Sequence, residues 1–149
     1  MAKHQTLLGP LGHADTVLVI GLGRFGSALA ISLEEMGHDV MGVDLDPNLV
    51  ADHASALSHV LEADTTRLET LRQIGAEDVS AAVVAIGTDI EASILTTAAL
   101  VDLEVPSIWA KALTEPHARI LERIGATEVV FPERDMGVRV AHQVTRRMI

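Results

Sequence analysis

Residues 16–46 read TVLVIGLGRFGSALAISLEEMGHDVMGVDLD, and this stretch decides the fold. A strand-like run of Val and Ile leads into three glycines with the spacing G-x-G-x-x-G, at positions 21, 23 and 26. A helical pattern over Ala28–Met36 follows, and Asp44 ends the next strand-like run. Strand, glycine loop, helix and acidic residue in this order form the fingerprint of a dinucleotide-binding βαβ unit. The stretch therefore predicts a nucleotide-binding crevice.

Each residue of the fingerprint has a physical role. Gly21 permits the tight turn, Gly23 lets a pyrophosphate approach the backbone, and Gly26 lets helix and strand pack closely. The helix N-terminus offers free N–H groups and a partial positive charge to the phosphates. Asp44 can accept hydrogen bonds from ribose hydroxyls, and its charge disfavours the 2′-phosphate of NADP. Arg24 is predicted to lie beside the phosphates, with a solvated surface arginine as the alternative.

Beyond this unit, short Val/Ile/Ala-rich runs alternate with longer helical patterns. The runs are Thr16–Ile20, Val40–Asp44, His59–Ala63, Ala81–Ile86, Ser107–Ala110 and Glu128–Phe131. Most lack strict apolar/polar alternation, so we expect strands buried on both faces of a parallel sheet. The prediction is an α/β fold, a Rossmann-like doubly wound parallel sheet of six strands with a C-terminal crossover helix. Three helical patterns end at a glycine expected in the left-handed conformation, namely Gly37, Gly75 and Gly125.

Composition narrows the class of protein. The 149 residues fit one domain, 48% of them are hydrophobic, and no cysteine is present for disulfides, thiolate catalysis or metal binding. A formal net charge of -10 argues against a nucleic-acid partner, which would require clustered Lys and Arg. No apolar run is long enough to span a bilayer, so direct membrane insertion is not expected. Residues 1–15 are interpreted as a flexible tail that precedes the domain at 16–149.

Few residues beside the crevice suit catalysis. There is no tyrosine, which removes the Tyr-x-x-x-Lys site of short-chain reductases, and the seven histidines form no metal-ligand pair. The residues therefore favour a binding and sensing module over an enzyme. A small NAD-dependent oxidoreductase, or a redox-sensing NAD(H)-binding domain, remains the alternative.

Several further blocks carry a family resemblance. The stretches VIGLGRFGSALAISLEEMGHDVMGVDLD, AIGTDIEASILTTAAL, SIWAKA and PERDMGVRVA resemble the nucleotide-binding lobe of regulator-of-K+-conductance (RCK) domains, in particular those of Ktr/Trk-type potassium uptake systems. The resemblance runs from Thr16 to Ile149. It implies a cytoplasmic regulatory subunit that binds ATP, ADP or NAD(H), forms homodimers within octameric rings, and gates a membrane K+ channel or transporter at the inner face of the cell membrane.

The resemblance also implies roles for individual residues. Asp64 would lie by the adenine, Lys111 would approach the phosphates, and Glu133 would face the phosphates or a bridging Mg or Ca ion. Each has an ordinary alternative: a cap for the helix near Thr66, an exposed loop lysine, and a carboxylate that complements a helix dipole. The expected nucleotide-contacting set is completed by Phe25, Leu45, Thr65, Ile86 and Gly87.

Two helices bear on assembly. The segment GTDIEASILTTAALVDL is expected to pack on the sheet, with its small polar positions alternating with apolar ones, and a second apolar or small face would suit a subunit interface. The last helix carries an i, i+4 stripe of Met136, Val140, Val144 and Met148, which needs a cover, from a partner subunit or from the chain's own sheet. In the family a C-terminal lobe follows this helix. The present sequence shows no such lobe, so we expect either part of a longer protein or a single-lobe variant.

Overall fold

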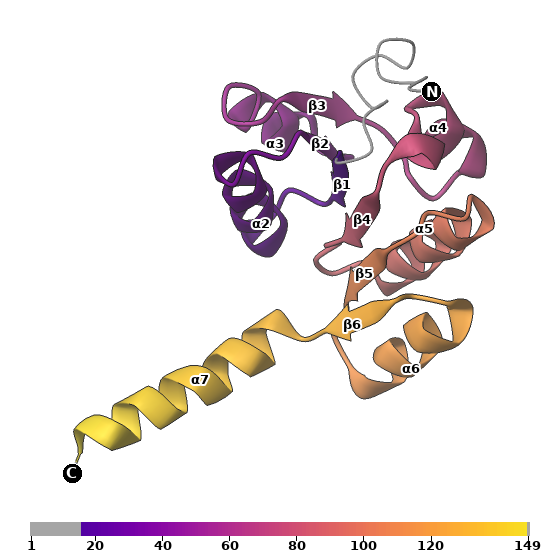
Figure 1. Ribbon diagram of the computed structural model, residues 1–149. Coiled ribbons are helices and arrows are strands. Elements are labelled where there is room, and N and C mark those ends of the chain that lie inside the picture. Colours follow the sequence, from indigo (N-terminus) through magenta and orange to yellow (C-terminus); the bar gives the residue numbers. More distant parts are fainter. Residues whose placement is uncertain (1–15, 149) are drawn as a thin grey trace.

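The computed structural model describes residues 16–148, in which strands and helices alternate as predicted (Figure 1). The strands are β1 (Val17–Ile20), β2 (Val40–Asp44), β3 (His59–Glu62), β4 (Ala81–Val84), β5 (Ile108–Lys111) and β6 (Glu128–Val130). The helices are α2 (Arg24–Glu35), α3 (Pro47–Asp52), α4 (Leu68–Gln73), the short 3-10 helix η2 (Ala76–Asp78), α5 (Ile90–Asp102), α6 (Glu115–Ile124) and α7 (Pro132–Arg147). The tail predicted at residues 1–15 lies outside the described residues.

The six strands form one all-parallel sheet in the order β3-β2-β1-β4-β5-β6. β1 lies at the centre, where Leu18 pairs with Met41 of β2 on one side and Ala82 of β4 on the other. This is the order of doubly wound dinucleotide-binding folds, and the predicted fold class is confirmed. Because the direction of winding reverses between β1 and β4, a crevice opens at the carboxyl ends of these strands.

Helices cover both faces of the sheet, which explains the continuous apolar runs of its strands. On one face, Val19 and Leu22 pack in a core cluster with Ala30 of α2. On the other face, α4, α5 and α6 contribute Leu71, Leu100 and Leu121, all with 0% exposure. β1 is consequently buried along its whole length, because it has an apolar layer above and below it.

The helix ends follow the glycines. Gly37, Gly75 and Gly125 have φ values of +95°, +89° and +124°, as predicted for the residue that terminates a helix before a strand. α2 begins at Arg24, earlier than the predicted Ala28, because the helix starts within the glycine loop itself.

α5 packs one face on the sheet and leaves apolar side chains exposed on another. Its small polar side chains face inward, since Ser93, Thr96 and Thr97 are all buried within the chain's own fold. This burial agrees with the expectation that α5 packs on the sheet. The apolar side chains that α5 exposes are Ile90 and Leu95, at 36% and 45%.

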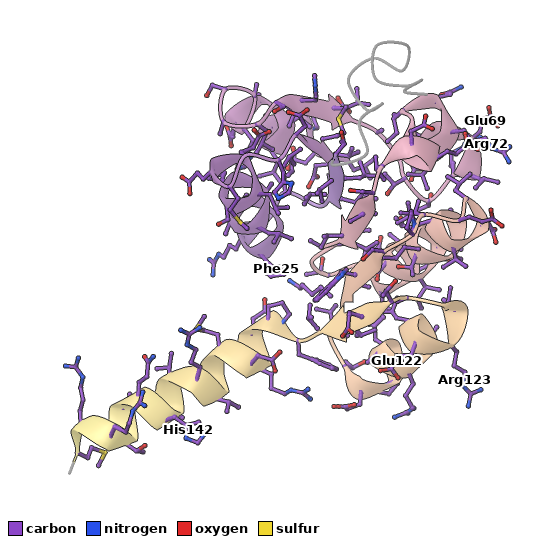
Figure 2. The ribbon with its side chains drawn as sticks, in the orientation of Figure 1. Phe25, Glu69, Arg72, Glu122, Arg123 and His142 are labelled. Carbon is purple, nitrogen blue, oxygen red and sulfur yellow. The ribbon has the colours of Figure 1, made fainter. Side chains whose placement is uncertain are left out.

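Beyond its first turn, where Glu133 pairs with Lys111 and Arg134 pairs with Glu115, α7 extends away from the rest of the fold with side chains projecting around it (Figures 1 and 2). Its stripe is exposed: Met136, Val140, Val144 and Met148 have exposed fractions of 54%, 45%, 52% and 76%. The alternative in which this stripe packs on the chain's own sheet is therefore wrong. Within residues 16–148, no helix combines the length and apolar character that crossing a membrane requires.

Candidate nucleotide-binding site

A pocket of about 450 Å³ lies at the carboxyl ends of the central strands, where the sheet reverses its winding. Eight of the residues expected at the nucleotide line it: Gly21, Gly23, Asp44, Leu45, Asp64, Thr65, Ile86 and Gly87. Unpredicted lining residues also come from the segments after β2, β3 and β4: Leu49, Thr66, Thr88, Asp89 and Ala92. Thr66, Thr88 and Asp89 lie just past strand ends, which is the signal that would have identified them, whereas Leu49 and Ala92 lie within α3 and α5.

The three glycines of the loop have different spatial requirements. Gly21 has φ +101°, and an added Cβ would lie 2.7 Å from the carbonyl oxygen of Ala85. A Cβ on Gly26 would lie 1.7 Å from the carbonyl oxygen of Gly21, so helix and loop are in direct backbone contact there. A Cβ on Gly23 would meet nothing within 4 Å, although Gly23 lines the pocket. Gly21 and Gly26 are thus required by the fold, whereas Gly23 leaves room for a ligand.

The N-terminus of α2 is left open for an anion. No side chain caps it, its N-cap is Gly23, and its first turn holds no acidic residue. The neighbouring helix α5, in contrast, is capped by Asp89, which accepts a hydrogen bond from the Ala92 N–H. The first N–H groups of α2 are therefore available to phosphate oxygens.

Positive charge is otherwise scarce in the pocket. Among the described residues, no lysine or arginine lines it. Arg24 is the exposed first residue of α2, and neither it, Phe25 nor Gly26 belongs to the lining. The open end of α2 is accordingly the main electropositive element that faces the pocket.

Asp44 joins the two halves of the fingerprint. Its Oδ2 accepts a hydrogen bond of 2.7 Å from the Leu22 N–H, and its Oδ1 accepts one of 2.9 Å from the Asp46 N–H. The carboxylate is thereby fixed at the end of β2. Each carboxylate oxygen has a second lone pair, so both remain able to accept from ribose hydroxyls.

Asp64 and Thr65 form the opposite wall. Asp64 Oδ1 accepts hydrogen bonds from the Thr66 hydroxyl, at 2.6 Å, and from the Thr66 N–H, at 3.1 Å, which hold the pKa of Asp64 below its usual value. Asp64 therefore orders a turn before α4 rather than capping that helix, whose N-cap is Arg67. Thr65 is buried, and its hydroxyl lies 3.0 Å from that of Thr96.

Lys111 and Glu133 lie together but outside the pocket lining. Lys111 ends β5 and its side chain is 8% exposed, so the alternative of an exposed loop lysine is wrong. Its Nζ lies 3.3 Å from Oε2 of Glu133, in the first turn of α7. The pKa of Glu133 is lowered by a hydrogen bond from its own backbone N–H and by the Lys111 ammonium.

The predicted metal role of Glu133 would require ligands from outside the described residues of this chain. Residues 16–148 contain no group of three or more His, Asp or Glu side chains that could hold a metal ion. A cation at Glu133 would also have to compete with the Lys111 ammonium. Glu133 can supply the oxygens of one carboxylate, and further ligands would have to come from phosphates, water or another copy of the chain.

Fold, glycine loop, open helix N-terminus and Asp44 together define a nucleotide-binding domain of the Rossmann type. The profile of the TrkA-N domain matches residues 17–132, and the chain belongs to the TrkA-N domain family. The resemblance to RCK domains stated from the sequence is confirmed.

Individual relatives agree with this assignment. The chain is 42% identical over 127 residues to Ktr system potassium uptake protein A of Bacillus subtilis (strain 168), a match that covers 85% of this chain and 57% of the relative. It is 39% identical over 131 residues to Ktr system potassium uptake protein A of Vibrio alginolyticus, which covers 88% of this chain and 60% of the relative. The crystal structure of the GsuK RCK domain is 30% identical with a TM-score of 0.67, covering 78% of this chain and 25% of that chain. The chain thus spans 57% and 60% of the length of the two potassium uptake proteins.

Proposed function

We propose that this chain is the nucleotide-sensing part of a cytoplasmic regulatory subunit that gates a membrane K+ channel or transporter. The observation that carries the proposal is the pocket at the reversal point of the sheet, lined by the glycine loop and Asp44, in a chain 42% identical to a Ktr potassium uptake protein. The protein is proposed to bind its nucleotide as a signal, and not to transform it.

The ligand is an adenine nucleotide, ATP or ADP or NAD(H), whose orientation follows from the chemistry of the pocket. Asp44 accepts hydrogen bonds from the ribose, and the adenine lies toward Asp64 and Ile86. The phosphates lie at the open N-terminus of α2, where backbone N–H groups and Arg24 stabilise their charge. Lys111 takes part if its bond to Glu133 is released on binding.

α7 supports assembly with a second copy. Its four stripe residues would leave apolar surface in water, and burial of apolar surface contributes roughly 25 cal/mol per Å². The sheet also has an uncovered apolar position, because Trp109 of β5 is 41% exposed. A homodimer, and within a full-length protein an octameric ring, would cover such surfaces beneath the membrane partner.

Titration calorimetry with ATP, ADP, AMP, NAD+ and NADH tests the binding part, with GTP as the control for base selectivity. We expect saturable binding of one or more adenine nucleotides and none of GTP. Absence of binding to every adenine nucleotide would overturn the proposal. Turnover of NADH, followed by its absorbance, would instead favour the oxidoreductase alternative.

A divalent cation is the last part of the proposal. We expect Mg or Ca to change nucleotide affinity in the wild type, and Glu133→Gln to reduce that change. The control is Glu122→Gln, which removes an exposed carboxylate from α6, away from the phosphates. Wild-type titrations that are insensitive to both cations would exclude a metal role for Glu133.

A further inference from the structure

A series of hydrogen bonds between buried polar groups starts at the wall of the pocket. Thr65 lines the pocket and is 6% exposed, and its hydroxyl lies 3.0 Å from that of Thr96, which is 0% exposed. Thr96 belongs to α5. The nucleotide pocket is thus hydrogen-bonded to the interior face of a helix that spans the far side of the sheet.

The series of hydrogen bonds continues one turn earlier on α5. Ser93 lies three residues before Thr96, on the same helix face, and its Oγ is 3.0 Å from Nε2 of His117 on α6. His117 Nδ1 accepts a hydrogen bond of 3.0 Å from the Leu113 N–H. Because a backbone N–H only donates, Nδ1 is the acceptor and Nε2 carries the proton, which it donates to Ser93. Burial lowers the pKa of His117, which favours this neutral ring.

The last hydrogen bond of the series reaches Leu113, in the loop after β5. Leu113 follows β5 by two residues, in the loop whose Ala112 N–H bonds to the Val130 carbonyl of β6 at 2.8 Å. The same loop follows Lys111, whose ammonium pairs with Glu133 of α7. His117 therefore links α5 to the loop that follows Lys111, the partner of Glu133 in α7.

We propose that this series of hydrogen bonds, Thr65–Thr96 followed by Ser93–His117–Leu113, couples occupancy of the nucleotide pocket to the first turn of α7. The inference rests on the proposed function. Its members are positioning residues. A ligand that contacts Thr65 would shift a hydroxyl whose partner is fully buried, and this buried hydrogen bond would be costly to lose.

Thr97 supplies a matched control from the same helix. It is also 0% exposed, yet its hydroxyl has no hydrogen-bond partner among the described residues. Thr96→Val and Thr97→Val thus make the same chemical change at adjacent buried positions. Thr96 belongs to the series of hydrogen bonds, and Thr97 does not.

The experiment measures amide hydrogen exchange of residues 111–114 and of the first turn of α7, with and without saturating nucleotide. The probe is whichever of ATP, ADP and NAD+ the wild type binds most tightly by calorimetry. We expect nucleotide-linked protection in the wild type and in Thr97→Val, and its reduction by about threefold or more in Thr96→Val. Ser93→Ala provides the same test if Thr96→Val does not fold. His117→Asn, which keeps an acceptor near Nδ1, should retain more protection than His117→Leu.

The outcomes separate two failures. A wild type that binds none of the three nucleotides overturns the proposed function and this inference with it. A wild type that binds but shows no protection at residues 111–114, or equal losses in Thr96→Val and Thr97→Val, overturns the coupling alone.

Discussion

Lys111 Nζ lies 3.3 Å from Oε2 of Glu133, so a buried ammonium at the end of β5 is paired with a carboxylate at the start of α7. The exposed fractions of the two side chains are 8% and 74%. Only the lysine is therefore strongly removed from water, while the carboxylate paired with it remains solvated. The pair thus joins the end of β5 to the first turn of α7.

Glu133→Gln should lower the free energy of unfolding by about 1 kcal/mol, since it removes the charge that compensates a buried ammonium while solvent weakens the pair. Glu115→Gln is the control, because Glu115 pairs with Arg134 at 2.7 Å and both side chains are more than half exposed. Its cost should stay below about 0.5 kcal/mol. Chemical denaturation measures both, and equal effects would contradict the importance of the buried lysine.

Gly23→Ala and Gly26→Ala should separate binding from folding. A Cβ on residue 23 would meet no protein atom within 4 Å, and Gly23 lines the pocket, so the variant should fold normally and lose nucleotide affinity by about tenfold or more. The Cβ on residue 26 collides with the Gly21 carbonyl, so that variant should lose thermal stability as well. Melting curves and calorimetry test the pair. Wild-type affinity in Gly23→Ala would show that phosphates do not approach this backbone.

Asp44→Ala should weaken adenine-nucleotide binding by about 10- to 150-fold, the range expected when a hydrogen bond to a charged group is lost. Asp46→Ala controls for the stability of the same segment. Asp46 caps α3 through the Asn48 N–H and does not line the pocket, so its loss should lower stability without changing affinity. Unchanged calorimetric affinity in Asp44→Ala would exclude its role at the ribose.

Arg24→Ala should weaken ATP binding more than AMP binding, because the guanidinium interacts most strongly where the ligand carries most charge. If Arg24 acts on a nucleotide held by another copy, the substitution should also weaken nucleotide-linked association in sedimentation experiments. Arg119→Ala, an exposed arginine on α6, is the control for a general change in surface charge. Equal losses for ATP and AMP would make Arg24 an ordinary surface residue.

Val144→Glu should reduce the oligomeric state measured by light scattering while leaving the protomer folded. The side chain is 52% exposed in the single chain, so the charge should disturb a subunit contact and not a core. Val138→Glu is the matched control on the same helix, at 53% exposure but off the stripe. A wild type that is monomeric with and without nucleotide would refute association through α7.

Local sequence patterns were sufficient for the strands, the glycine loop and the helix ends. Continuous apolar runs report burial on both faces, and a glycine reports a close approach or a left-handed backbone, as at Gly21 and Gly26. These properties depend on a few consecutive residues and on the chain's own sterics. For the same reason, the position of Asp44 at the end of a strand was enough to predict it at the pocket.

Tertiary structure alone decided which distant groups pair. That Asp44 binds the Leu22 N–H, that Thr65 meets Thr96, and that Lys111 is buried against Glu133 all depend on strand order and on where each helix lies over the sheet. Periodicity identified the stripe on α7 but not whether the chain's own sheet covers it. An apolar stripe is the same in sequence whether its cover is intramolecular or another molecule, because hydrophobic burial has no directional preference.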